Sequence, residues 1–158
     1  MVRPYRCSDL PVLMDIGNRA WKPIYDMYER QRGKALFALL TPNRDTVKGD
    51  QIRAHAERSP ENLLVCEEGG RIVGFITFHL DREKGIGTIG NNAVDPACGL
   101  KGIGQQMYAA AFARFRQEGM RYAKVTTGLD EAHARARRAY ERAGFNVRQE
   151  DVTYYREL

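Results

Sequence analysis

The first third of the chain shows the hydrophobic spacing of helices. Apolar residues recur three or four positions apart over residues 13–20, which places them on one helical face. Proline fits the first turn of a helix, and a turn-rich segment such as TPNRD interrupts one. Three helices are therefore predicted: one capped by Ser8 or Asp9, one opened by Pro23 and broken at 41–45, and one over Val47–Arg58 that Ser59-Pro60 ends.

The middle third has the β-branched and aromatic residues that are typical of strands. Gly69-Gly70 supply the positive φ angles of a tight turn between the first two apolar runs. Asp95-Pro96 ends the third run, because proline cannot donate to a sheet ladder. A three-stranded antiparallel meander is therefore predicted over Leu63–Cys66, Ile72–Leu80 and Ile86–Val94.

The last third alternates between the two patterns. Apolar residues at four-residue spacing begin at Met107, and a second helix has Asp130 as its candidate N-cap. Gly144 lies where a C′ glycine belongs, with Phe145 as the accompanying hydrophobic contact. The predicted order is a helix over Ile103–Glu118, a strand over Arg121–Thr126, a helix over Glu131–Ala143 and a strand over Asn146–Arg156. The whole pattern indicates a mixed α/β (α+β) fold with one twisted sheet.

Two glycine patterns lie on either side of the end of the meander. Gly85–Gly90 reads G-x-G-x-x-G, but a turn precedes it and a strand end follows, whereas a dinucleotide fingerprint lies between a strand and a helix. These glycines are expected at turn and bulge positions. Gly99–Gly104 does lie between a predicted strand and a predicted helix, where free N–H groups and the helix dipole favour a phosphate. An ordinary strand-to-helix turn explains this second pattern equally well.

Composition narrows the class of protein. The chain of 158 residues suits one domain, 1–158, and 43% hydrophobic with 28% charged residues is ordinary for a globular protein. No apolar run approaches a membrane span, and the N-terminus lacks a leader pattern, so a cytoplasmic protein is expected. Three cysteines at wide spacing form no metal or disulfide pattern. A net charge of +5 permits an anionic ligand but requires none.

Two longer segments change this picture. The sequence NAVDPACGLKGIGQQMY, residues 92–108, resembles motif A of the GNAT superfamily of acyl-CoA-dependent N-acetyltransferases. AYERAGF, residues 139–145, resembles motif B of the same superfamily, in the right order and at a fitting separation. The resemblance implies a single GNAT-like domain with a splayed mixed β-sheet of 6–7 strands flanked by about 4–5 helices. It also implies acetyl-CoA in the cleft between the fourth and fifth strands, for which Ile86–Val94 and Arg121–Thr126 are expected.

The resemblance also implies particular site residues. Tyr140 matches the motif B tyrosine that acts as general acid in many members, and Asn92 lies at the strand position that polarises the thioester carbonyl. Gly99 stands where motif A usually has Gln or Arg, so backbone amides are left to hold the pyrophosphate. The residues expected to bind acetyl-CoA are Asn92, Ala93, Val94, Gly99, Leu100, Lys101, Gly102, Ile103, Gly104, Gln105, His133, Ala136, Arg137 and Tyr140.

Several of these residues have a second interpretation. Tyr140 is also a core aromatic at helical spacing, and Asn92 is also a polar strand end. His133, expected on one helix face with Tyr140, either holds the pantetheine, acts as a base or is solvated. The arginines within 135–142 invite a nucleic-acid interpretation, although aromatic residues do not interleave with them.

The function implied is transfer of an acetyl group from acetyl-CoA to a primary amine of an unidentified acceptor, by direct attack in a ternary complex. The alternative is a CoA-binding or basic RNA-binding module without acetyl transfer. Under the first, the partners are acetyl-CoA and an amine-bearing small molecule or peptide, with no metal, nucleic acid or membrane and with a possible homodimer. Trp21, Tyr25 and Tyr28 on the N-terminal helices are candidates for the wall of the acceptor site, or for a helix core patch.

Overall fold

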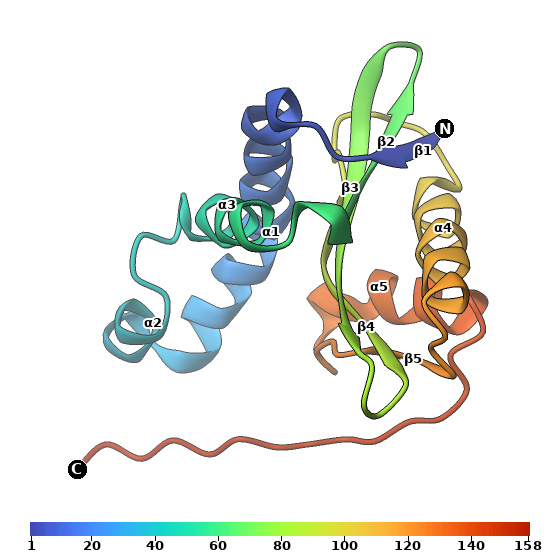
Figure 1. The fold of residues 1–158 in the computed structure, drawn as a ribbon. Coiled ribbons are helices and arrows are strands. Elements are labelled where there is room, and N and C mark those ends of the chain that lie inside the picture. Colours follow the sequence, from blue (N-terminus) through green and yellow to red (C-terminus); the bar gives the residue numbers. More distant parts are fainter.

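A single mixed sheet separates two layers of helices in the computed structural model, which describes residues 1–158 (Figure 1). Its five strands lie side by side in chain order: β1 (Val2–Pro4), β2 (Leu63–Glu68), β3 (Arg71–Asp81), β4 (Ile86–Val94) and β5 (Tyr122–Val125). The helices are α1 (Leu10–Arg32), α2 (Lys34–Leu40), α3 (Val47–Arg58), α4 (Ile103–Gln117) and α5 (Ala134–Arg142). The N-terminal helices α1–α3 lie on one side of the sheet, and α4 and α5 lie on the other.

The sheet is antiparallel from β1 to β4, and β5 joins it parallel to β4. A parallel neighbour needs a crossover connection, and α4 supplies it. The expected fold class, a mixed α/β fold, is confirmed. So is the three-stranded meander, with positive φ angles at Gly69 and Gly70 in its first turn. None of the helices combines the length and the apolar character that crossing a bilayer requires.

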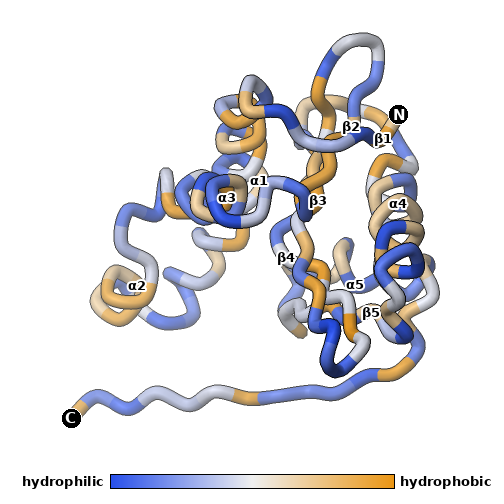
Figure 2. The backbone as a smooth tube through the Cα atoms, viewed as in Figure 1, coloured by the Kyte–Doolittle hydropathy of each residue, from blue (hydrophilic) through white to orange (hydrophobic).

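Strand β3 explains why the core has two halves. Successive side chains of a strand point to opposite faces, so Phe75 packs with α1 and α3 whereas Ile76 and Phe78 pack with α4. Figure 2 shows hydrophobic segments along β3 and along helices on both sides of it. The half under α1 contains Leu13 and Ile16, both fully buried. Because both faces of the sheet are covered, residues of β4 can contribute to two different environments.

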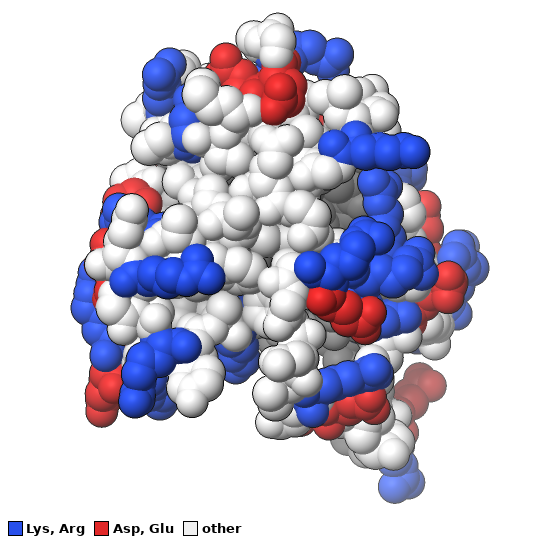
Figure 3. Space-filling view, turned by 90° about the vertical axis from the view of Figure 1, so that its right-hand side faces the viewer, with Lys and Arg blue, Asp and Glu red and all other residues white.

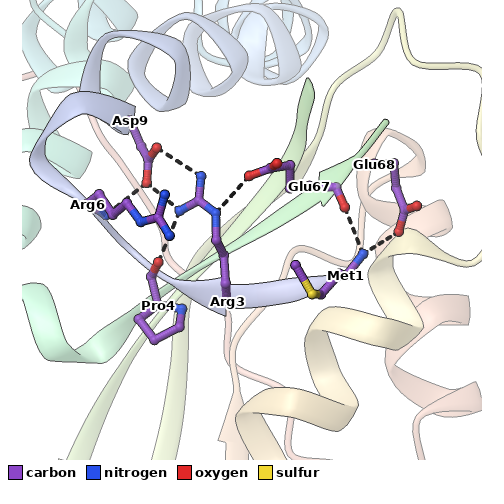
Figure 4. A network of polar contacts seen from close by, with 7 residues as sticks. All are labelled: Met1, Arg3, Pro4, Arg6, Asp9, Glu67 and Glu68. Atoms are coloured by element: carbon purple, nitrogen blue, oxygen red, sulfur yellow. Dashed lines mark hydrogen bonds and ion pairs between the residues drawn. The ribbon is translucent and has the colours of Figure 1, made fainter. Parts of the chain in front are cut away.

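Strand β1 is a short edge strand that the sequence pattern did not indicate, and ion pairs fasten it (Figure 4). Arg3 donates two hydrogen bonds to the carboxylate of Asp9, at 2.8 and 3.0 Å, and one to Glu67 at 2.8 Å. Asp9 also accepts from the N–H of Arg6, which holds the short 3₁₀ turn before α1. The side chain of Asp9 therefore does not cap α1, contrary to the expectation for this residue.

Two other expectations are wrong. Helix α1 continues through Pro23 rather than restarting there. Buried residues on both sides of the proline offset the lost hydrogen bond, since Ile16 packs in the core under α1 and Tyr25 packs on Phe37 of α2. Residues 146–156 form no strand, so the sheet has five strands and not six or seven. No strand pairs with this segment, and Val147, Val152 and Tyr154 are exposed.

Candidate active site

Strand β4 extends beyond β5, so its last residues have no strand beside them on that side. The two strands pair only from Ile86↔Tyr122 to Ile89↔Val125, where β5 ends, while β4 continues to Val94. The N–H of Asp95 bonds to the carbonyl of Val73 on β3, so the backbone of Ala93, two residues earlier, also faces β3. By the same alternation, the backbone groups of Asn92 and Val94 face the opening beside β5. An extended ligand finds two unpaired strand positions there.

Three polar side chains meet at this opening. Asn92 of β4 lies against Tyr108 of α4 and Tyr140 of α5, whose rings are 5.3 Å apart. The hydroxyl of Tyr108 donates to Asn92 Oδ1 at 3.1 Å, and Asn92 Nδ2 donates to the Tyr140 oxygen at 3.1 Å. The same Nδ2 reaches the carbonyl of Gly90 at 3.3 Å, which keeps the amide close to β4. The structure therefore brings Asn92 and Tyr140, both expected in the site, into direct contact.

The protons of the two tyrosines are used differently. The proton of Tyr108 is donated to Asn92, whereas no hydrogen bond of the structure engages the proton of Tyr140. Burial raises the pKa of both hydroxyls, so both are protonated at neutral pH. Polar contacts from Asn92 and Tyr108 oppose this rise at Tyr140, whereas Tyr140 adds to the rise in the pKa of Tyr108. In this network Tyr140 is thus the tyrosine whose proton has no acceptor.

The end of α5 fixes the Tyr140 ring. Gly144 has a φ of 99° and donates to the carbonyl of Glu141 at 3.0 Å, and Phe145 N donates to the carbonyl of Tyr140 at 3.2 Å. These are the two hydrogen bonds of a Schellman motif, which confirms the expected helix end. Phe145 packs on Tyr140 and Phe112, with ring centroids 5.9 and 5.6 Å apart. Gly144 and Phe145 of motif B thus fix the position of the Tyr140 ring.

The second glycine pattern forms the turn between β4 and α4. Gly99 and Gly102 have φ angles of 66° and 81°, and a Cβ at either would meet open space. Gly102 is the N-cap of α4, and no side chain caps the helix. The N–H of Gln106 bonds to the carbonyl of Gly102, so the amides of Ile103, Gly104 and Gln105 before it lack intrahelical acceptors. These uncapped donors next to an open turn suit a phosphate.

The first glycine pattern has the structural role expected of it. Gly85 has a φ of 67° in the turn before β4. Gly90 lies in a bulge opposite Thr77, and a Cβ there would be 2.7 Å from the Thr77 hydroxyl oxygen. At Gly87 a Cβ would be 2.5 Å from the ring of Phe115. These positions need glycine for backbone conformation and packing.

Asp95 anchors the turn that leads to α4. Its carboxylate, almost completely buried, accepts from Arg19 of α1 at 2.6 Å and from the N–H of Ala97 at 2.9 Å, and Arg71 lies 3.5 Å away. The hydrogen bond from Arg19 holds the pKa of this carboxyl below its usual value, with further lowering from Ala97. The loop carrying the glycines is therefore tied at its first residue to the helix layer on the other side of the sheet.

Replacing Asp95 by Asn is expected to lower the free energy of unfolding by about 1.5–3 kcal/mol, because the buried carboxylate that accepts hydrogen bonds from Arg19 and the N–H of Ala97 loses its charge. The loss should be present above the ordinary carboxyl pKa of 3.8 and fade as the pH falls through the lower folded pKa. Urea unfolding at neutral and acidic pH measures it. Asp15→Asn is the control, since Asp15 pairs with the same Arg19 but is exposed. Equal losses in the two variants would contradict this role of Asp95.

The remaining predicted residues of α5 have other partners. His133 precedes α5 in a 3₁₀ turn and its Nδ1 lies 2.8 Å from both carboxylate oxygens of Asp130. Asp130 Oδ1 also accepts from the N–H of His133, which confirms the N-cap. Arg137 donates to the carbonyls of Gly128 and Asp130, at 2.7 and 2.6 Å. Arg137 thus holds the loop between β5 and α5.

Gln105 connects the two helices beside the opening. Its side-chain amide donates to the carbonyl of Ala139 at 2.8 Å, one residue before Tyr140. Leu100 and Lys101 are exposed in the turn before α4, and Ala136 is half-buried on α5. The structure therefore gathers Asn92, Val94, the glycine turn and Tyr140 around one opening, while His133 and Arg137 mainly stabilise the adjoining loop. Ala93 was also expected there, but its backbone faces β3 and its side chain is buried in the core under α1.

The opposite face of β4 carries a second polar cluster that the sequence analysis did not identify. Lys48 of α3 donates to Asn91 Oδ1 at 3.0 Å and to Gln51 Oε1 at 2.6 Å, and its Nζ lies 4.3 Å from the centroid of the Trp21 ring. Burial lowers the pKa of Lys48 to about 8. Trp21 of this cluster was a candidate from the sequence, but no local pattern singled out Lys48. Tyr108 was missed similarly, since helical spacing marks it as a core aromatic.

The three N-terminal aromatic candidates do not form one wall. Trp21 faces Lys48, Tyr25 is buried against Phe37 with ring centroids 6.3 Å apart, and Tyr28 lies 6.2 Å from the His133 ring. Only Trp21 therefore joins the cluster at β4. The arrangement as a whole places the glycine turn with its free amides and Tyr140 on one face of the sheet, and the polar cluster around Lys48 on the other.

Comparison with known proteins agrees with this geometry. Residues 21–145 match the model of the acetyltransferase (GNAT) family. A mycothiol acetyltransferase of Segniliparus rotundus is 31% identical over 101 residues, which are 60% of this chain and 36% of the relative. The chain thus spans about a third of the length of the curated relatives it matches.

Solved structures share the fold. A GNAT family acetyltransferase from Brucella melitensis, in complex with acetyl-CoA, has a TM-score of 0.64 at 23% identity, over 98% of this chain and 95% of that one. An aminoglycoside acetyltransferase from an uncultured soil metagenomic sample, in complex with sisomicin, has a TM-score of 0.65 at 16% identity, over 100% and 95%. At these identities the likeness describes the fold alone.

Proposed function

Because the chain belongs to the acetyltransferase (GNAT) family, we propose that it transfers an acetyl group from acetyl-CoA to the primary amine of an acceptor by direct attack in a ternary complex. The observation that carries the proposal is the free proton of Tyr140 at the opening between β4 and β5. We propose that residues 1–158 act as a single catalytic domain.

Two features would hold acetyl-CoA. The unpaired backbone groups of Asn92 and Val94 suit the amides of the pantetheine arm, which would lie along β4 as another strand does. The free amides at the start of α4, over 103–105, suit the pyrophosphate, and the glycines of the turn leave room for its approach. Lys101, exposed in the same turn, adds a positive charge at the rim.

The chemistry then needs few side chains. The neutral amine attacks the thioester carbonyl carbon, and the tetrahedral oxyanion is stabilised by a backbone N–H at the opening. As the intermediate collapses, the carbon–sulfur bond breaks and the thiolate takes the proton of Tyr140. The attacking nitrogen, cationic in the intermediate, gives up one proton, and that proton passes through solvent to the tyrosinate and restores Tyr140. The products are an amide and CoA, with charge and protons balanced.

No observation favours the RNA-binding alternative. On the face that contains α4, Lys and Arg are interspersed with Asp and Glu around a largely uncharged centre (Figure 3). Arg137 of the basic run binds two carbonyls, so its donors are already engaged. Nucleic-acid binding typically needs a continuous basic surface. Acetyl transfer accounts for the opening, the turn and the tyrosine together.

The direct test is thiol release from acetyl-CoA with a panel of amines, combined with calorimetric binding of acetyl-CoA. We expect binding without any amine and thiol release that depends on one of the amines. Binding without release across a broad panel would favour a CoA-binding module. Absence of acetyl-CoA binding would contradict the proposal outright.

Gly99→Arg is expected to tighten acetyl-CoA binding. Gly99 faces open space, so a guanidinium there can reach the pyrophosphate, and a well-placed charge-assisted hydrogen bond contributes roughly 1.5–3 kcal/mol. Its φ of 66° makes any side chain cost about 1–2 kcal/mol of stability, which thermal unfolding should register. Calorimetry measures the affinity, and Gly33→Arg, with a φ of 77° in open space far from this turn, is the control. Affinity that is unchanged or weaker would contradict this path of the loop.

A further inference from the structure

Lys48 is a buried cation without an anion. Only 7% of the residue is exposed, and its two hydrogen-bond acceptors, Gln51 and Asn91, are neutral amides. No carboxylate lies within 4.0 Å of its Nζ, and the ring of Trp21 is its remaining polarisable neighbour. The other buried charges behave differently, since Asp9 and Asp95 are each paired with arginine.

Burying the Lys48 ammonium without an anion lowers the stability of the fold. Moving an ammonium group out of water disfavours its charged form, and neutral acceptors replace only part of the hydration. The pKa of about 8 reflects this burial, yet leaves the protonated form dominant at neutral pH. An ammonium has three donors, and two are used here. The third donor and the uncompensated charge are available to an anionic ligand.

The position of Lys48 relates this charge to the reaction. Asn91, which holds Lys48, directly precedes Asn92, which holds Tyr140. Adjacent residues of a strand point to opposite faces, so the cation and the proton donor flank the same stretch of β4 from opposite sides of the sheet. The anion-binding turn before α4 lies next to the face of Tyr140. On the face of α1 and α3, Lys48 and Trp21 are the charged and aromatic groups beside this stretch of β4.

We propose that the acceptor carries a carboxylate close to its amine, and that this carboxylate pairs with Lys48 while the ring of Trp21 lines the same site. The proposal rests on the acetyl transfer proposed above and specifies its substrate class: an amino acid or a similar small carboxylate-bearing amine. Polycationic amines are excluded, because their charges would be repelled by an unpaired ammonium.

Matched pairs of acceptors test the class. Each pair consists of an amino acid and its carboxamide, and thiol release from acetyl-CoA is measured at equal concentration. We expect kcat/KM to be at least about tenfold higher for the carboxylate member, as a charge-assisted hydrogen bond provides. The carboxamide has the less basic amine and would otherwise react faster, so the chemistry works against the expected preference. Equal use of both members, or preferential use of a polyamine, would overturn the proposal while leaving acetyl transfer intact.

A second measurement needs no turnover. Trp21 is the single tryptophan of the chain, and its ring contacts the Lys48 ammonium, so its fluorescence reports an anion at this position. N-acetylated amino acids, which have a carboxylate and no reactive amine, are titrated in the presence of CoA, with their carboxamides as controls. A saturable change with the carboxylates alone supports the proposal. No change with any carboxylate at millimolar concentration overturns it, whether or not the protein transfers acetyl groups.

Two variants separate the charge from the packing. Lys48→Met removes the charge and keeps the stem, and Asn91→Asp keeps Lys48 but supplies a carboxylate 3.0 Å from it. Both are expected to be at least as stable as the original protein and to lose the carboxylate preference about tenfold or more. Both should also lose the Trp21 response. A Lys48→Met or Asn91→Asp protein that keeps the preference would show that the carboxylate binds elsewhere.

Discussion

Tyr140→Phe is expected to lower turnover by about 10²–10⁴-fold, the usual effect of removing a general acid. The change keeps the ring that packs on Phe145 and Tyr108, so the fold should be unaffected. Acetyl-CoA affinity should also be unchanged, because the hydroxyl acts as the thiolate leaves and not in the ground state. Steady-state kinetics of thiol release, with calorimetry of acetyl-CoA, separate the two quantities.

Tyr108→Phe is the matched control. Tyr108 belongs to the same network, is as deeply buried, and contacts the same Asn92, but its proton is already donated. Loss of the Tyr108 hydroxyl should lower turnover only several-fold, because the Asn92 side chain would be held by one hydrogen bond fewer. Equal effects of the two changes would mean that the network positions a substrate and does not deliver a proton. Full activity of a folded Tyr140→Phe protein would remove the acid role from Tyr140.

Gly104→Asp is expected to weaken acetyl-CoA binding at least about tenfold, which corresponds to about 1.4 kcal/mol. The new carboxylate would lie among the free amides at the start of α4, where it competes with the pyrophosphate and repels it. Gly104 has no positive φ, and a Cβ would come no closer than 3.7 Å to the Tyr108 ring, so the substitution fits the fold. Calorimetric titration with acetyl-CoA measures the loss.

The same substitution should not destabilise the protein. An acidic side chain in the first turn of a helix interacts favourably with the helix dipole, so the thermal midpoint should be equal or higher. Ala109→Asp, exposed further along the same helix, introduces the same charge away from the turn and should leave affinity within a few-fold. Near-original affinity of folded Gly104→Asp would show that the pyrophosphate binds elsewhere.

Local sequence rules predicted the elements that frame the site. The end of α5 follows from Gly144 and Phe145 alone, because a Schellman motif is built from backbone hydrogen bonds within a few residues. Helix α3 was predicted with its bounds, since Ser59-Pro60 blocks its continuation. The turn between β4 and α4 follows from glycines with positive φ angles, again a property of single residues.

Long-range packing overruled local rules elsewhere. Proline ends many helices, but the buried contacts of α1 on both sides of Pro23 maintain one continuous helix. The alternating residues of 146–156 are typical of a strand, yet a strand exists only where a neighbour supplies hydrogen bonds, and no neighbour pairs with this segment. Strand β1 shows the converse, since three residues form a strand once Arg3 pairs with Glu67 across it.

The sequence by itself determined the family, the glycine turn and the place of Tyr140 at the end of a helix, because each of these features depends on a short motif of neighbouring residues. Only the tertiary structure decided which polar groups meet. Asn92 and Tyr140 are 48 positions apart, and Lys48 and Asn91 are 43 apart. Contacts between such distant residues depend on how β4 is positioned between two helix layers, and no local pattern encodes that. The free proton of Tyr140 and the unpaired charge of Lys48 are consequences of packing.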